Sequence, residues 1–541
     1  MSVVSIDVSL FRKMVTNGAI NLKNNHAEVD ALNVFPVPDG DTGTNMSMTV
    51  TSGIRELENC EASSIIEEAK VLSRGCLMGA RGNSGVILSQ FFRGLYVGIK
   101  QLDHNYLNVQ DLMACLESGC KIAYKAVMEP VEGTILTVVR ESAEYARTKV
   151  NECKTIDELL DVYLGKAKES LANTPNLLPV LKEAGVVDSG GAGFVKIVEG
   201  MVMAIKGEIL EADDAQPKSE PVEEVNPQDL KYFYSMDFEL ELKKPEQFEI
   251  KEYKAALSLV GENLEVTEEG TLVKTHINTN RPGRILDIAQ KQGEFNILNV
   301  ENLRYTALKA QEPEQKAEIS PRKQFALIAV CFGDGISQTF KELGVDYVIE
   351  GGQTMNPSTE AFVEALKAVN AENVIIIPNN SNVIMAANQA KNLVSGCNVE
   401  VLKAKTIAQG YVSLVNYNPE ASLEENYEAM SEQIANVTSG EITYSVRDTE
   451  IGGVKIQSGD YMGISNGEIL VSVKDKSDCL HDLLEKIIKD ESEIVTVFVG
   501  ADVTQEEKDT IEDLCLSFNS DIDVEIVDGK QEIYSYIIAV E

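Results

Sequence analysis

The sequence predicts a multidomain protein with an all-α N-terminal domain, a small α/β middle domain and a C-terminal α/β domain. Apolar residues recur at helical spacing from residue 5 to about residue 206, whereas β-rich runs alternate with helical segments after Pro321. Between them, residues 208–229 are acidic, contain three prolines and lack apolar periodicity, as is typical of a linker. The 541 residues also exceed what one core holds. The predicted domains are 1–206, 230–319 and 320–541, with a linker at 207–229.

The N-terminal region is expected to form a helical bundle. In its first segment, one helix face carries Phe11, Met14, Val15, Ala19 and Leu22. Similar spacing recurs through residues 63–74, 84–100, 109–128 and 155–172. Because each segment has an apolar face to bury, the pattern favours helices that pack on one another.

The later regions carry strand patterns. Residues 294–302 alternate and a turn precedes them at 281–283, which favours a small α/β domain. The C-terminal region contains β-rich runs at 325–332, 346–352, 373–380 and 493–500. Gly or Asn stands at the end of each run or directly after it, before the helical segment that follows. This order predicts a parallel sheet whose carboxyl edge presents backbone amides. At that edge, the polar stretches 351–359 and 378–382 either face a ligand or partner or simply cap helices.

Composition narrows the function classes. A net charge of −38 argues against a nucleic-acid or anionic-membrane surface, because both reward clustered Lys and Arg. Nine cysteines without a CxxC pair indicate reduced thiols rather than a disulfide framework. The first residues lack a basic segment followed by an apolar one, and no apolar run approaches the roughly 20 residues of a membrane helix. We therefore expect a cytoplasmic protein without stable membrane insertion.

The segment from Asn33 to Asn45, NVFPVPDGDTGTN, carries the strongest chemical signal. Two prolines forbid a helix and two glycines allow sharp turns, leaving Asp39 and Asp41 as hard oxygen ligands in a loop. The pattern predicts a divalent metal site, with a solvated Asp-Gly turn as the simpler alternative. A calcium-binding EF-hand is excluded, because Thr44 and Val50 occupy the positions that need Gly and Glu.

Other loops of the same region suggest phosphate binding. The chain lacks a GxxxxGK[ST] motif, so a bound metal would have to offset phosphate charge that the lysine of this motif otherwise offsets. Mg²⁺ needs only one or two protein carboxylates. Two glycine-rich loops, 78–85 and 186–193, each precede a helical run, and EGTILT lies at 132–137. Helix N-termini offer free amides and a positive dipole end to phosphates. Singly, each loop is more often a plain interhelical connection, but together with the Asp loop they form a constellation that favours a phosphate site.

At these residues the chain resembles the ATP-binding subunit of bacterial fatty acid kinase, along its whole length. The shared motifs include LNVFPVPDGDTGTNM, LMGARGNSGVILSQ, PVEGTILTV, GVVDSGG, VIEGGQTMNPST and PNNSNVIMAANQA. The first domain is similar to the L subunit of dihydroxyacetone kinase, which implies an eight-helix barrel that binds ATP and two Mg²⁺ ions. The C-terminal domain is expected to be DegV-like.

The resemblance also implies residue roles. Asp39 and Asp41 would hold the metals, with Asn33 as the third ligand and Asp30 as its alternative. The residues expected to contact phosphates are Thr42, Gly43, Thr44, Asn45, Asn83 and Ser84. Those expected to line the nucleotide pocket are Thr134, Asp188, Ser189 and Gly190.

The middle domain departs from the pattern of its relatives. These are expected to bind zinc through one cysteine and two histidines, whereas this chain has Ser235 and Asn278 at two of the positions and retains only His276. An imidazole with an amide and a hydroxyl is a poor zinc set, because zinc prefers thiolate and imidazole. We expect no structural zinc. His276 is either a catalytic group or an ordinary strand histidine.

The expected reaction is phosphoryl transfer from ATP to a fatty acid, giving an acyl phosphate. A fatty acid carboxylate is already ionised at pH 7, so the transfer needs no general base. Arg81 is the candidate cation for the transferred group, or else it fixes its loop through a carboxylate. The expected partner is a DegV-like fatty-acid-binding carrier, and a homodimer is expected from the resemblance. The alternatives are a dihydroxyacetone-type kinase and a nucleotide-sensing adaptor without turnover.

Overall fold

The computed structural model describes residues 2–34, 37, 40–211, 231–304, 322–352 and 356–541. The chain divides into two compact units. The first combines Met1–Ala212 with Pro321–Glu541, and the second is Asp213–Ser320. The first unit thus contains both the N-terminal helical domain and the C-terminal α/β domain, which contact each other, and the second contains the middle domain.

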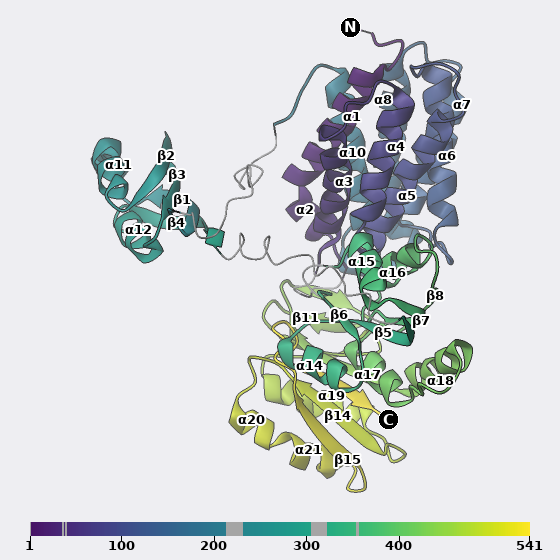
Figure 1. Ribbon diagram of the computed structural model, residues 1–541, viewed down its shortest axis with the longest axis vertical. Coiled ribbons are helices and arrows are strands. Elements are labelled where there is room, and N and C mark those ends of the chain that lie inside the picture. The colour runs from purple at the N-terminus through teal and green to yellow at the C-terminus, as the bar shows by residue number, and fades with distance from the viewer. Residues whose placement is uncertain (1, 35–36, 38–39, 212–230, 305–321, 353–355) are drawn as a thin grey trace. The chain divides into compact units, whose positions relative to one another are not determined.

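The N-terminal domain is helical, as predicted (Figure 1). Eight of the helices in its described part have 14 to 22 residues: α1 (Val8–Asn24), α3 (Thr42–Glu58), α4 (Ile65–Met78), α5 (Gly82–Ile99), α6 (Val109–Lys125), α7 (Ile135–Lys149), α8 (Ile156–Leu177) and α10 (Ser189–Ile205). Two short helices join them, α2 (His26–Asp30) and α9 (Pro179–Ala184). Neighbouring helices pack in sequence order, and α10 packs on both α8 and α1. The long helices therefore close into a ring, as a barrel requires.

Local sequence explains where these helices begin. Side-chain oxygens of Asp7, Ser64, Asn108 and Thr155 accept hydrogen bonds from backbone N–H groups of the first turn of α1, α4, α6 and α8. The ring interior is filled by apolar side chains, among them Phe91 and Phe194, whose rings meet edge to face at 5.1 Å. Because the interior is apolar, the polar loops lie at the two ends of the barrel.

The described part of the middle unit is an antiparallel sheet with two α-helices and one short 3-10 helix. Its strands lie in the order β2-β3-β1-β4. Their bounds are β1 (Tyr234–Leu242), β2 (Gly261–Glu269), β3 (Leu272–Thr279) and β4 (Gly293–Asn302), with helices η1 (Pro245–Gln247), α11 (Ile250–Ser258) and α12 (Pro282–Ala289). Alternate residues of β1 and β3 pack with α11 and α12, and the residues between them form a polar face. The predicted turn at 281–283 is the start of α12, with Pro282 at its first position.

The described part of the C-terminal domain contains two larger sheets and a two-stranded hairpin. The first is parallel, with strand order β6-β5-β7-β8. The bounds of its strands and surrounding helices are β5 (Lys323–Cys331), β6 (Tyr347–Glu350), β7 (Ala371–Ile377), β8 (Asn398–Val401), α14 (Asp334–Glu342), α15 (Thr359–Val369), α16 (Ile384–Lys391), α17 (Ile407–Val415) and α18 (Leu423–Asn436). One face packs on α15 and α16, and the other packs on α14, α17 and α18.

The second sheet has the order β13-β12-β9-β16-β14-β15 and is mostly antiparallel. Its elements, with the adjoining hairpin, are β9 (Thr438–Tyr444), β10 (Thr449–Ile451), β11 (Val454–Ile456), β12 (Tyr461–Ser465), β13 (Glu468–Val473), α19 (Lys476–Ile487), β14 (Ile494–Val499), α20 (Gln505–Asp509), α21 (Ile511–Phe518), β15 (Asp523–Asp528) and β16 (Tyr536–Val540). The expectation that the run 493–500 belongs to one parallel sheet with the other three was wrong. That run is β14, which pairs with β15 in parallel and with β16 antiparallel.

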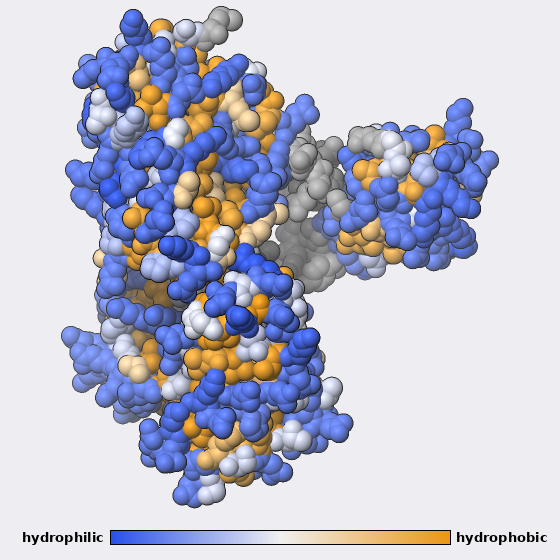
Figure 2. All heavy atoms as spheres, turned by 180° about the vertical axis from the view of Figure 1, so that it is seen from behind, coloured by the Kyte–Doolittle hydropathy of each residue, from blue (hydrophilic) through white to orange (hydrophobic). Residues whose placement is uncertain are grey.

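The predicted fold class is confirmed, and the predicted domain limits stay a prediction. Helix α10 ends at Ile205, β1 begins at Tyr234, β4 ends at Asn302 and β5 begins at Lys323. Most of the linker predicted at 207–229 lies outside the described residues. On the face drawn in Figure 2, the surface is mostly hydrophilic. Among the described helices, none combines the length and apolar character needed to cross a bilayer.

Candidate active site

Four helices of the barrel begin at one pocket. Helices α3, α5, α7 and α10 start at Thr42, Gly82, Ile135 and Ser189, and residues at or beside each of these starts line a cavity of about 380 Å³. Ten of the predicted site residues line it: Asn33, Asp41, Thr42, Asn45, Asn83, Ser84, Thr134, Asp188, Ser189 and Gly190. The loops that the sequence singled out separately therefore meet in space.

Asn33 and Asp41 hold the loop end next to α3. Asp41 is the residue before the first turn of α3 and lines the pocket. The Asn33 Oδ1 accepts hydrogen bonds from Thr42 Oγ1 at 2.6 Å and from Ser189 Oγ at 3.3 Å. This amide thus ties the start of α3 to the start of α10. Asp39, the other predicted metal ligand, lies outside the described residues.

Asp30, the alternative candidate for the third metal ligand, instead binds the first turn of α3. Its Oδ1 accepts hydrogen bonds from the backbone N–H groups of Gly43 at 2.6 Å and Thr44 at 3.1 Å, and its Oδ2 accepts one from Thr44 Oγ1 at 2.7 Å. The Asp30 carboxylate therefore caps α3 from the side and is not among the pocket-lining residues. Gly43 and Thr44, predicted to contact phosphates, are likewise absent from the lining and face Asp30.

Close packing at the helix starts requires glycine. A Cβ atom on Gly43 would lie 2.3 Å from the His26 carbonyl oxygen. Gly82 has a φ of +61°, and a Cβ atom there would lie 2.7 Å from Asn45 Nδ2. These two glycines let the first turn of α3 approach α2 and the first turn of α5 approach Asn45, so that Thr42, Asn45 and Asn83 line the same pocket.

Asp188 and Thr134 also line the pocket. Asp188 precedes α10, and its Oδ2 accepts a hydrogen bond from the Gly191 N–H at 2.6 Å. Burial raises the pKa of this carboxyl to about 6, although the hydrogen bonds from the Gly191 and Ile135 N–H groups oppose that shift. Thr134 precedes α7, and its Oγ1 donates to the Val131 carbonyl at 2.8 Å.

The C-terminal domain contributes residues that the sequence analysis did not assign. Asn382, after β7, lines the pocket, and Asn83 Nδ2 donates to the Ser381 carbonyl at 3.4 Å. Asn356, after β6, donates from Nδ2 to Asp41 Oδ2 at 2.6 Å. Both asparagines belong to the polar stretches 351–359 and 378–382, and the polar composition of these stretches was the sequence feature that indicated a ligand or partner. Nothing in that composition identified the helical domain as what they face.

Arg81 lies at the boundary between the two domains. Its Nη1 donates to the Asn356 carbonyl at 2.7 Å, and its backbone forms an isolated antiparallel bridge with Ser358. Burial lowers the pKa of its guanidinium. Arg81 does not belong to the pocket lining. A catalytic role for Arg81 stays a prediction.

In the middle unit, His276 pairs with an acidic residue. Its Nδ1 lies 2.6 Å from Asp237 Oδ1, and the two residues are directly opposite on β3 and β1. Ser235 and Asn278 are also opposite each other on the same polar face. The structure therefore groups the positions at which relatives were expected to bind zinc, and it adds Asp237 beside them. A catalytic role for His276 stays a prediction.

Family models match along most of the chain. The FakA-like C-terminal model of fatty acid kinase matches residues 326–541, the FakA-like middle-domain model matches residues 231–309, and the DAK2 domain model matches residues 36–203. Protein YloV of Bacillus subtilis (strain 168) is 42% identical over 556 residues, which cover all of both chains. The uncharacterized protein SAR1202 of Staphylococcus aureus (strain MRSA252) is 42% identical over 548 residues, or 99% of each chain.

Solved structures resemble parts of the chain more distantly. A DegV-family protein of Ruminococcus gnavus with vaccenic acid is 14% identical, with a TM-score of 0.31, and the match covers 40% of this chain and 99% of that one. The dihydroxyacetone kinase of C. freundii in complex with AMP-PNP and Mg²⁺ is 15% identical, with a TM-score of 0.29, over 54% of this chain and 55% of that one. At these TM-scores neither likeness adds to what the family models show. On the family models and the two full-length relatives, the chain belongs to the FakA-like family of fatty acid kinase proteins.

Proposed function

We propose that this chain is an ATP-dependent kinase subunit that phosphorylates the carboxylate of a fatty acid presented by a separate fatty-acid-binding protein. The product is an acyl phosphate. The observation that carries the proposal is the convergence of the N-termini of α3, α5, α7 and α10 on one pocket beside Asp41. Membership in a family of kinases supports it.

The pocket suits a polyphosphate. Each converging helix brings backbone N–H groups of its first turn and the positive end of its dipole to the same place. The described lining contains no Lys, Arg or His, so these helix ends supply its positive character. We assign phosphate contacts to Thr42, Asn45, Asn83 and Ser84, which line the pocket. Gly43 and Thr44, which were also expected to contact phosphates, instead hold the start of α3 through their hydrogen bonds to Asp30. Thr134, Asp188, Ser189 and Gly190 line the remainder of the nucleotide site.

The donor set fits Mg²⁺. Asp41 and Asn33 place a carboxylate and an amide oxygen at the pocket, and hard oxygens are what this ion prefers. Asp39 completes the proposed ligand set, which would hold two ions. When bound, Mg²⁺ offsets the negative charge of the β- and γ-phosphates. The protein's own part is to hold the Asp41 carboxylate in place through Asn356. The Asn33 Oδ1 accepts hydrogen bonds from Thr42 and Ser189, so it would release one of them to bind an ion.

A carboxylate acceptor matches the chemistry of the pocket. Because a fatty acid is ionised at pH 7, its oxygen attacks without losing a proton, and positioning with charge stabilisation suffices. The γ-phosphoryl group moves to the carboxylate oxygen as its bond to ADP breaks. Arg81 is the proposed cation for this group, and His276 is the second proposed catalytic residue. The middle and C-terminal domains are proposed to dock the DegV-like carrier, and we propose a homodimer.

Replacing Asp41 tests the proposal. D41N removes the ligand charge, so acyl phosphate formation should fall about 100-fold, equivalent to roughly 3 kcal/mol of barrier. The assay combines labelled ATP, Mg²⁺, oleate and a fatty-acid-binding carrier, and traps acyl phosphate as the hydroxamate. D161N is the matched control, because Asp161 forms an exposed ion pair with Lys206 at the end of α10.

The outcomes separate the candidate functions. Carrier-dependent acyl phosphate that D41N abolishes and D161N preserves supports the kinase. Activity that survives in D41N contradicts the metal assignment. Tight ATP binding without any turnover supports a nucleotide-sensing adaptor instead.

A second candidate function is phosphorylation of a small hydroxylated substrate, as in a dihydroxyacetone-type kinase. The observation that favours it is Asp188, a pocket carboxyl whose burial raises its pKa to about 6, which is closer to the pH at which a general base works best. Against this role, Asp188 already caps α10 through Gly191. ADP release that depends on dihydroxyacetone and not on oleate with its carrier would favour this function.

A further inference from the structure

The C-terminal domain reaches the nucleotide pocket through side chains that do not belong to the helical barrel. Helices α15 and α16 pack on α4 and α5, and Ala80 and Val86 of the barrel are buried in the apolar cluster between the parallel sheet and these two helices. From this base, residues that follow β6 and β7 reach the pocket. Their contacts fall on Asp41 and on the first turn of α5.

Asn356 is the central residue of this contact. It is 1% exposed, and its amide Nδ2 donates to Asp41 Oδ2 at 2.6 Å while its backbone carbonyl accepts from Arg81 Nη1 at 2.7 Å. The backbone near it is fixed, because the Thr359 N–H donates to the Ala80 carbonyl at 3.0 Å. Asn356 is therefore held rigidly against a proposed metal ligand by the neighbouring domain.

An amide is well suited to this position. A carboxylate held in one orientation loses less conformational freedom when it binds a cation. A Lys or Arg in place of Asn356 would also orient Asp41, but it would cancel the charge that attracts the metal. The neutral amide fixes the carboxylate and leaves its charge intact.

A second contact holds the other end of the same loop. The Arg447 guanidinium, which follows β9, donates to the carbonyls of Ala31, Asn33 and Val34. Val34 and Val37 pack against the apolar residues of the β10–β11 hairpin and of β12 and β13. The loop that carries the metal ligands is thus held from the C-terminal domain on both sides.

We propose that Asn356 is a positioning residue of the nucleotide site, through which the C-terminal domain controls metal binding in the helical domain. This inference rests on the proposed function. It makes the packing of the C-terminal domain on the barrel a condition for a complete site.

The test measures metal-dependent nucleotide binding in the full chain. AMP-PNP is titrated calorimetrically at a series of Mg²⁺ concentrations. N356A leaves Asp41 in place without this donor, and the Mg²⁺ concentration for half-maximal binding should rise about 10–100-fold, as for other residues that orient metal ligands. N356D sets a second carboxylate against Asp41, so binding should be lost at low Mg²⁺ and recovered at high Mg²⁺, with a larger rise in Tm on adding Mg²⁺ than in the wild type.

Gln389 provides the matched control at the same interface. It is 9% exposed, donates from Nε2 to the Leu77 carbonyl at 2.8 Å and accepts from Gln90 at 2.9 Å, but it does not line the pocket. Q389A removes hydrogen bonds between the same two domains without touching Asp41. It should lower Tm and leave the Mg²⁺ dependence unchanged.

The results distinguish this inference from the function on which it rests. Equal Mg²⁺ dependence in N356A and wild type, or an equal rise in N356A and Q389A, would overturn the positioning role alone. A wild-type chain that binds no AMP-PNP at any Mg²⁺ concentration would overturn the proposed function itself.

Discussion

At the scale of single residues, the candidate site is built from side chains that both begin helices and face the pocket. Asp41, Thr134 and Asp188 each occupy the position before the first turn of a helix and line the cavity. A polar residue before an apolar helical run can be recognised in a sequence. Local pattern alone does not show that three such caps meet, because that depends on how the helices close into a ring.

Asp188 predicts a pH dependence of stability. Its pKa is raised to about 6, above the ordinary value of an aspartate, so the folded chain binds this proton more tightly than the unfolded chain. The free energy of unfolding should therefore decrease as pH rises from about 4 to 6. Above pH 6 it should be lower than below pH 4 by up to about 3 kcal/mol. D188N keeps a capping oxygen and removes the charge, so it should raise Tm at pH 7.5.

Thermal unfolding of the ligand-free protein between pH 4 and pH 8 provides the measurement. D161N, which alters an exposed carboxylate, should show the same pH profile as the wild type. A D188N protein that is less stable than the wild type at pH 7.5 would show that the negative charge itself stabilises the fold.

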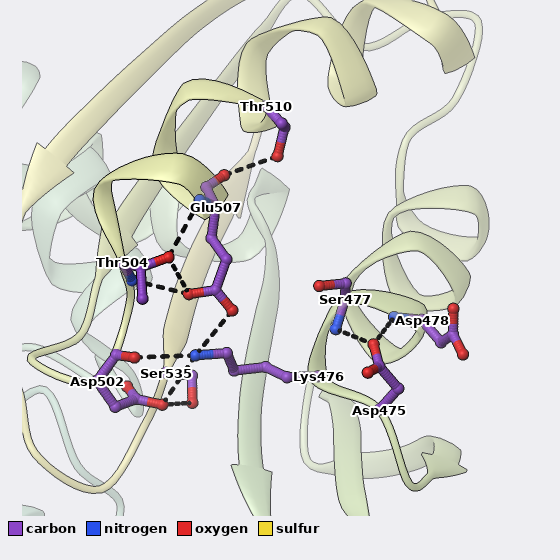
Figure 3. Close-up of polar contacts among 9 residues, drawn as sticks. All are labelled: Asp475, Lys476, Ser477, Asp478, Asp502, Thr504, Glu507, Thr510 and Ser535. Atoms are coloured by element: carbon purple, nitrogen blue, oxygen red, sulfur yellow. Dashed lines mark hydrogen bonds and ion pairs between the residues drawn. The ribbon is translucent and has the colours of Figure 1, made fainter.

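At the scale of elements, a largely buried lysine joins three parts of the C-terminal domain (Figure 3). Lys476 begins α19, and its side chain is 13% exposed. Its Nζ donates to the Asp502 carbonyl at 3.0 Å and pairs with Glu507 Oε1 at 3.1 Å. Burial alone would lower the pKa of Lys476, but the Glu507 and Asp502 carboxylates outweigh it, so the pKa is raised. The lysine thereby ties α19 to α20 and to the loop after β14.

Removing this lysine should loosen α20. K476M leaves Asp502 and Glu507 without their shared cation, at an expected cost of about 1–3 kcal/mol. Amide hydrogen exchange of residues 502–509 should become faster. K149M is the comparison, because Lys149 forms an exposed pair with Glu152 at 3.0 Å, for which about 0.5 kcal/mol or less is expected. Unchanged exchange at 502–509 would mean that the capping bonds from Thr504 to Glu507 suffice.

The sheet of the middle unit makes the zinc prediction testable. Ser235 lies opposite Asn278, and His276 lies two residues along β3 on the same face. The His276 ring is held through Nδ1 by Asp237, an arrangement that orients metal-binding histidines. Restoring the residues expected in relatives should therefore create a binding site.

We expect the wild-type chain to carry no stoichiometric zinc and the double variant S235C/N278H to bind about one zinc ion per chain. Metal analysis of the purified proteins by mass spectrometry measures this. The single variant N278H, with only two suitable ligands, is the control. One zinc ion per wild-type chain would contradict the prediction.

At the scale of the whole molecule, the first unit joins two domains that are separated in sequence by the middle domain. Their interface combines an apolar part, with Ala80 and Val86 in the cluster of α15 and α16, and a polar part at Asp41, Arg81 and Asn356. The apolar part accounts for the attachment of the domains. The polar part sits at the pocket, so attachment and site geometry are linked.

The sequence by itself determined the order of the three domains, the type of secondary structure in each, and the loops that supply Asn33, Asp41, Thr42, Asn83 and Asp188. These follow from local rules: apolar periodicity sets the elements, and Gly, Pro and capping residues set their ends. Only the tertiary structure decided that Asp30 caps α3, that β14 joins a separate mixed sheet, and that Asn356 and Arg447 contact the loop that carries Asn33 and Asp41. Asn356 and Asp41 are 315 residues apart, and contacts at that separation depend on how whole domains pack, which no local pattern records.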